Sequence, residues 1–206
     1  MTASHLQRLA TFLYETGFLK RAKRTGWWLL GIKEPESIAD HSFRTAIIGY
    51  ALAVMEGADP NKTAALCVFH DTQETRIGDV PSVGKPYVTA ASDSAVVADQ
   101  VAGVPPAVSA AIRAVVAEYE SEETPESQLA HEADKIECLM QAREYQAQGH
   151  KDAEPWITSS MERLRSESAR RLAEAALAVP PDAWWRNFAN TYTELQQRAR
   201  DNRISG

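Results

Sequence analysis

Two histidines and two aspartates along the chain are of the types that bind a divalent metal ion. They are His41, the adjacent pair His70 and Asp71, and Asp134. Imidazole nitrogens and carboxylate oxygens together suit Mn, Fe, Co, Ni or Zn better than an all-oxygen calcium cage or a thiolate zinc site would. If the fold brings these side chains together, the sequence predicts a site for one divalent cation, an ion that can polarise a phosphoryl oxygen and lower the pKa of a bound water.

The positions of these residues favour metal binding over an ordinary surface role. His70 and Asp71 follow the apolar run 64–69, where an unpaired acid would be costly to bury. Asp134 lies at the edge of an apolar helical face. His41 opens a helix whose inward face we predict to carry Phe43, Ile47, Ile48, Ala51, Leu52 and Met55. The other three histidines, His5, His131 and His150, are expected to be surface residues.

Two further acids, Glu74 and Asp79, follow the His70-Asp71 pair closely. A metal ion with carboxylates beside it combines electrophilic activation with groups that can transfer protons. This combination indicates a hydrolase.

The pattern of apolar residues predicts an all-α protein, because helical spacing recurs and no strand pattern persists. We expect helices that end near Gly17, that begin near residues 37–40, that begin at Asp59-Pro60, and that cover 106–118 and 125–148. Two amphipathic helices separated by Pro180-Pro181 close the chain, and 78–92 is expected to be a loop. We predict one domain over 1–206, a helical bundle with its motif-bearing core at about 9–145 and its C-terminal helices at about 155–202.

The composition excludes some partners and predicts a location. The formal net charge is −6, which argues against non-specific nucleic-acid binding, and the short basic patch 20–24 is expected to be a solvated helix end. No apolar run approaches the length of a membrane span, and the N-terminus lacks the features of a signal peptide. Cys67 and Cys138 lie in apolar runs, so we expect buried, reduced thiols in a cytoplasmic protein.

Four local sequences carry a resemblance to a known family. They are RTGW at 24–27, PESIADH at 35–41, FHDTQETRIGDV at 69–80 and ADKIECLMQAREY at 133–145. Together with the order of His, His-Asp and Asp, they resemble the HD-domain 5′-deoxynucleotidases of the HD phosphohydrolase superfamily. The resemblance spans roughly residues 9–145.

The resemblance implies an HD-type helical bundle, usually a homodimer, that hydrolyses deoxyribonucleoside 5′-monophosphates. It implies one divalent ion (Mn, Co, Mg, Fe, Ni or Zn) held by His41, His70, Asp71 and Asp134. Glu74 and Asp79 match the family's catalytic acids, Trp27 matches a tryptophan near the substrate sugar, and Arg24 is the matching phosphate-binding residue. In the bacterial branch an arginine directly precedes the tryptophan, whereas Gly26 stands there in this chain.

Some alternatives stay open at this point. The same metal chemistry serves nucleoside triphosphates, cyclic nucleotides and phosphorylated specialised metabolites, and a triphosphate would need more basic residues near the site. Candidates are Lys20, Arg21, Lys23 and Lys85. A non-enzymatic binding module on the same fold is a further alternative. We expect Trp28 to pack in the core. The last helix is rich in aromatic residues, which could pack on the core or at a subunit interface, with core packing favoured; they are Trp184, Trp185, Phe188 and Tyr192.

Overall fold

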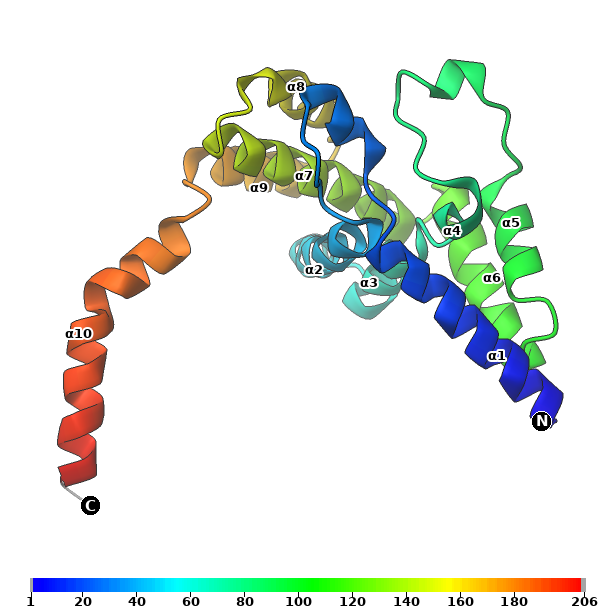
Figure 1. The fold of residues 1–206 in the computed structure, drawn as a ribbon, viewed down its shortest axis with the longest axis horizontal. Helices are drawn as coiled ribbons and strands as arrows, with labels where there is room; N and C mark the ends of the chain where they lie inside the picture. Colours follow the sequence, from blue (N-terminus) through cyan, green and yellow to red (C-terminus); the bar gives the residue numbers. More distant parts are fainter. Residues whose placement is uncertain (1, 205–206) are drawn as a thin grey trace.

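The computed structural model describes residues 2–204 and is built from α-helices and short 3-10 helices (Figure 1). The all-α prediction is confirmed, because the described residues contain no strand and only an isolated bridge between Lys23 and Ser37. In order, the helices are α1 (Ala3–Thr16), α2 (Ile38–Glu56), α3 (Pro60–Phe69), α4 (Glu74–Ile77), α5 (Asp93–Gln100), α6 (Pro106–Ser121), α7 (Pro125–Ala147), α8 (Glu154–Glu162), α9 (Glu167–Ala178) and α10 (Ala183–Ile204). The 3-10 helices are η1 (Gly17–Lys20), η2 (Thr25–Leu30), η3 (Lys85–Tyr87) and η4 (Lys151–Ala153).

Helix α7 runs through the middle of the bundle, and α2, α3, α8 and α9 pack around it. Its start follows the sequence signals. Thr124 accepts a hydrogen bond from the Ser127 backbone and Pro125 occupies the first turn. Ala130, Ala133, Ile136 and Leu139 lie in the main core. A second cluster, which includes Phe12, Val97 and Val116, joins α1, α5 and α6.

The predicted inward face of α2 is partly wrong. Ile48 and Leu52 are buried, but Phe43 is 69% exposed and Ile47 55% exposed. Ala51 and Met55 are also exposed. The helix is apolar around most of its surface, and its buried face carries the polar residues His41, Ser42 and Thr45. Hydrophobicity alone therefore selects the wrong face.

Polar residues on the buried face of α2 satisfy their hydrogen bonds within the helix. The hydroxyl of Ser42 donates to the carbonyl of Ile38 at 2.9 Å, and that of Thr45 donates to the carbonyl of His41 at 2.8 Å. Gly49 lies on the same face, where α2 crosses α3. A Cβ at this position would lie 2.6 Å from Cys67 Sγ, so the close approach of the two helices requires glycine.

The structure also corrects the predictions for the aromatic residues. Trp28 is 52% exposed, because the 3-10 turn of η2 directs it away from its buried neighbour Trp27. The aromatic residues of α10 are exposed as well, since α10 projects away from the body of the molecule after Pro180-Pro181 (Figure 1). Sequence reasoning missed α5 and α8 as separate helices.

The expectation of two buried thiols is met for Cys67 and only in part for Cys138. Cys67 and Cys138 are free thiols, the first buried and the second half-buried. Among residues 2–204, no helix has both the length and the apolar character needed to cross a bilayer.

Candidate active site

The four predicted metal-binding residues come together from three helices that pack on one another. His41 lies in the first turn of α2, His70 and Asp71 follow α3, and Asp134 lies on α7. His41 Nε2 lies 3.3 Å from His70 Nε2 and 3.3 Å from Asp134 Oδ1. His70 Nε2 lies 3.1 Å from Asp71 Oδ2. The ligand atoms of His41, His70 and Asp71 lie within 4.8 Å of one another.

The outer nitrogen of each imidazole has its own acceptor, and this sets the direction of each ring. His41 Nδ1 contacts a carboxylate oxygen of Glu137, and His70 Nδ1 lies 2.6 Å from the carbonyl oxygen of Cys67. A proton on each Nδ1 leaves both Nε2 lone pairs directed at the same point. Two converging lone pairs with two carboxylates beside them fit a divalent cation of borderline softness.

The electrostatics of the cluster also favour a positive charge at its centre. Burial and the Arg24 guanidinium lower the pKa of His41, but Glu137 and Asp134 outweigh them and raise it to about 10. Burial raises the pKa of Asp71, but His70 and Arg24 hold it well below its usual range. Burial is likewise outweighed at Asp134, where Lys135 and His41 hold the carboxyl pKa low. The two aspartates are therefore ionised at neutral pH.

Glu74 and Asp79 lie beside this cluster in different environments. Glu74 begins α4, and its Oε2 is buried without a hydrogen-bond partner among the described residues. Burial, followed by the charges of Asp71 and Asp79, raises the Glu74 pKa to about 9. Asp79 instead accepts hydrogen bonds from the backbone N–H of Thr25 and from its hydroxyl, the latter at 3.1 Å. Glu74 is thus a neutral acid at pH 7, whereas Asp79 anchors the segment that precedes Trp27.

Arg24 and Trp27 flank that anchored segment. Arg24 Nη1 donates to Asp71 Oδ2 at 3.2 Å and lies 4.0 Å from Asp79 Oδ1. Trp27 is only 2% exposed, and its indole N–H donates to Glu36 Oε1 at 2.9 Å. Its ring stacks on Trp156 with centroids 5.6 Å apart. The Trp27 ring is therefore held in place at the cavity wall, and its indole N–H is already engaged and cannot donate to a ligand.

These residues line a cavity of about 610 Å³. Of the eight predicted site residues, seven line it, and His41 lies buried behind them. Further lining residues that the sequence did not single out for the site include Gln73, Tyr119, Lys135, Trp156 and Arg163. Lys135 directly follows Asp134 and donates to it at 2.5 Å. Its position next to a candidate metal ligand could have identified it from the sequence as a site residue. Trp156 lies in α8 and Arg163 directly follows that helix, and neither belongs to the four motifs in the sequence.

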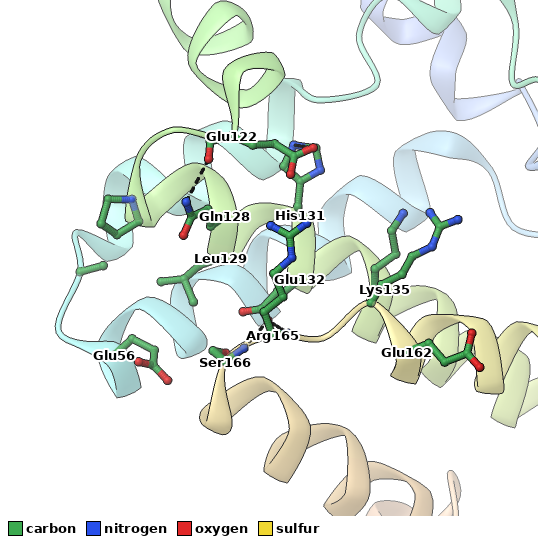
Figure 2. A pocket seen from close by; sticks show the side chains of 13 residues that line it. Glu56, Glu122, Gln128, Leu129, His131, Glu132, Lys135, Glu162, Arg165 and Ser166 are labelled. Carbon is green, nitrogen blue, oxygen red and sulfur yellow. Dashed lines mark hydrogen bonds and ion pairs between the residues drawn. The ribbon is translucent and has the colours of Figure 1, made fainter.

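A second cavity, of about 780 Å³, lies next to the first and is bounded by α7 and the turn between α8 and α9 (Figure 2). It contains none of the eight predicted residues, although His131, Lys135 and Arg163 line both cavities. Glu132 Oε1 accepts the backbone N–H of Ser166 at 2.7 Å, which holds the turn in place. The side chain of His131 is 26% exposed, and its ring stacks on that of Tyr119 with centroids 3.9 Å apart.

Comparisons with known proteins agree with this geometry. Residues 16–176 match a family model described as HD domain. The 5'-deoxynucleotidase hdd1 of Schizosaccharomyces pombe is 33% identical over 164 residues, which are 74% of this chain and 80% of that protein. The 5'-deoxynucleotidase HDDC2 of Danio rerio is 29% identical over 146 residues, covering 68% of this chain and 71% of that protein.

Solved structures show the same fold. A conserved hypothetical protein from Pyrococcus furiosus has a TM-score of 0.67 and 30% identity, covering 82% of this chain and 98% of the other. A predicted metal-dependent phosphohydrolase from Magnetospirillum magnetotacticum has a TM-score of 0.66 at 23% identity, covering 85% of this chain and 92% of the other.

Proposed function

The chain belongs to the HD domain family, and from this membership and the site's geometry we propose that it is a metal-dependent 5′-deoxynucleotidase. Its substrates are deoxyribonucleoside 5′-monophosphates, as the names of its relatives indicate for those proteins. The observation that carries the metal requirement is the convergence of His41 Nε2 and His70 Nε2, 3.3 Å apart, between the carboxylates of Asp71 and Asp134.

His41, His70, Asp71 and Asp134 would hold the ion. When bound there, a divalent cation supplies Lewis acidity toward a phosphoryl oxygen and lowers the pKa of water. Arg24 lines the same cavity, so its guanidinium can donate paired hydrogen bonds to the phosphate.

The environments of the two acids support different roles for them. In the metal-free protein the pKa of Glu74 is raised to about 9, and its buried Oε2 has no hydrogen-bond partner among the described residues, so Glu74 could give a proton to the departing 5′ oxygen. Asp79 keeps Thr25 in place and thereby positions Arg24 and Trp27. The buried Trp27 ring would form a wall against the deoxyribose, where a closed surface excludes a 2′ hydroxyl through steric overlap.

The test is phosphate release from paired 5′-nucleotides by chelator-stripped protein resupplied with Mn, Co, Mg or Zn. Each deoxyribonucleoside monophosphate is compared with its ribonucleotide and its triphosphate. We expect metal-dependent release from the deoxy monophosphates. Release that needs no metal, or that ignores the sugar, would refute the proposal.

Variants test the assignments. Asp71→Ala and Asp134→Ala should each lose both metal binding and turnover, and either one retaining both would refute its role as a ligand. Glu74→Ala should keep the metal and lose most of the rate. A Glu74→Ala rate near that of the wild type would leave Glu74 without a catalytic role.

A second candidate substrate class has a specific observation in its favour. Lys85, Lys135 and Arg163 line the cavity in addition to Arg24, and a longer phosphate chain would need such cations. Lys20, Arg21 and Lys23 do not line it, and Lys23 donates to the carbonyl of Pro35. The triphosphates in the panel decide between the two classes.

We also include a homodimer in the proposal. Phe43, Ile47, Tyr50 and Val54 form an exposed apolar stripe along α2, at spacings that place them on one side of the helix. Covering this stripe with a second copy would remove it from water. Light scattering should give a dimer mass for the wild type and a monomer mass for Ile47→Glu, whereas Tyr14→Glu, at an exposed aromatic on α1, should stay dimeric. A monomeric wild type would refute the dimer.

Two broader features complete the proposal. The free thiols of Cys67 and Cys138 support a cytoplasmic location. Residues 1–206 would form one domain, since α2, α3, α6, α8 and α9 pack around α7 and α5 packs on α6.

A further inference from the structure

The side of His41 that faces away from the cavity is held by a chain of charged residues between α2 and α7. His41 and Arg44 lie three residues apart on one face of α2. Glu137, Gln141 and Glu144 occupy the facing side of α7, again at spacings of one and two helical turns. This arrangement places the two sets of side chains in register along the packed helices.

Glu137 connects the two sets. One of its carboxylate oxygens accepts from His41 Nδ1. The other accepts from Arg44 Nε at 2.9 Å and from Arg44 Nη2 at 2.8 Å. The side chain of Glu137 is 1% exposed, so both oxygens are engaged inside the protein.

Arg44 also donates hydrogen bonds to α7 side chains that lie farther from His41. Its Nη1 donates to Glu144 Oε1 at 2.6 Å, and its Nη2 also donates to Gln141 Oε1 at 2.9 Å. A guanidinium fixed at three nitrogens presents a planar fork to Glu137. The carboxylate of Glu137 therefore has a fixed position from which to orient the His41 ring.

Glu36, His41 and Glu137 also lie close enough together to be considered as a second cation site. Three of the four carboxylate oxygens of Glu36 and Glu137 already accept hydrogen bonds. Glu36 Oε1 accepts the Trp27 indole N–H at 2.9 Å, and Glu137 is occupied by His41 and Arg44. We therefore assign this group to hydrogen bonding rather than to a second ion.

We propose that Glu137 is the positioning residue for the metal ligand His41, and that Arg44 fixes Glu137 in turn, so that this pair sets the affinity of the site for its ion. The inference rests on the proposed metal-dependent function. A carboxylate on the outer nitrogen of a metal-binding imidazole fixes the ring's tautomer and orientation and raises its basicity as a ligand.

The experiment measures the affinity of chelator-stripped protein for Co²⁺ alone, in competition with a chromophoric chelator. We expect Glu137→Gln to weaken Co²⁺ binding by about 10–100-fold, the range for loss of such an outer partner. Arg44→Lys keeps a charge but loses the fork, and should weaken binding less. Glu34→Gln, which removes an exposed acid outside this chain of side chains, is the matched control and should bind Co²⁺ as the wild type does.

Urea unfolding of the metal-free variants distinguishes an effect on the orientation of His41 from an effect on the stability of the fold. A purely structural role would lower the unfolding midpoint while the folded fraction bound Co²⁺ with wild-type affinity, and that result would overturn the inference. If Glu137→Gln does not fold, Arg44→Lys decides, and wild-type affinity in that variant would overturn the inference. A wild type that binds no divalent ion would instead refute the proposed function itself.

Discussion

Replacing Glu74 by glutamine should change how the stability of the metal-free protein depends on pH. The pKa of Glu74 is raised from 4.5 to about 9, first by burial and then by the charges of Asp71 and Asp79. Between these two values the folded protein binds a proton that the unfolded chain has released. Stability contributed by the neutral carboxyl is therefore complete below the unfolded value and is lost as pH rises toward 9.

The size of the effect follows from the proton linkage. Each pH unit inside this window removes about 1.4 kcal/mol of the unfolding free energy that Glu74 contributes, because its carboxyl proton is bound in the folded protein and released from the unfolded chain. Glutamine has the same shape as the protonated carboxyl and does not titrate. Between pH 6 and pH 8 the stability of Glu74→Gln relative to the wild type should thus rise by about 3 kcal/mol.

Urea unfolding in excess chelator at pH 6, 7 and 8 measures this difference directly. The control is Glu34→Gln, because Glu34 is an exposed acid outside the cavity, and this variant should keep the pH dependence of the wild type. If the difference between Glu74→Gln and the wild type stays constant from pH 6 to pH 8, Glu74 is ionised in the folded protein. It could then not serve as the proton donor.

Two further predictions concern the phosphate site and the helix crossing beneath the cluster. Arg24→Met should lower kcat/KM for a deoxynucleoside monophosphate by about 10–100-fold, the value of hydrogen bonds to a charged group, while the variant still binds Co²⁺. Unchanged kcat/KM would exclude Arg24 from phosphate binding. Gly49→Ala should destabilise the protein by about 1–3 kcal/mol in urea unfolding, because the new Cβ would lie 2.6 Å from Cys67 Sγ. Adding Cys67→Ala should recover part of that loss, and strictly additive effects would contradict the overlap.

The sequence predicted the helices that carry clear start signals. Asp59-Pro60 and Thr124-Pro125 mark the starts of α3 and α7, where the side chains of Asp59 and Thr124 accept backbone hydrogen bonds. It also gave the site residues that the cavity brings together. These residues are recognisable because an acid or an imidazole at the end of an apolar helix needs a partner.

The sequence did not predict which face of α2 is buried. An apolar stripe through Phe43 and Ile47 competes with a face that carries His41, Ser42 and Thr45, and hydrophobicity favours the first. The structure buries the polar face because those hydroxyls bond back to their own helix and His41 bonds to Glu137. Hydrogen bonds across helices depend on tertiary packing, which periodicity along one helix does not contain. The role of Glu137 was missed for the same reason.

The position of Arg24 links the two binding events of the proposed function. Its guanidinium donates to Asp71, a carboxylate that is also a proposed metal ligand. Without a cation at the centre, Arg24 and the protonated His41 ring are positive charges beside Asp71 and Asp134. An ion held by Asp71 and Asp134 would compete with Arg24 for the Asp71 carboxylate and would leave the Arg24 donors available to a phosphate. On the proposed assignments, this shared carboxylate would make the phosphate affinity of Arg24 depend on the state of the metal site.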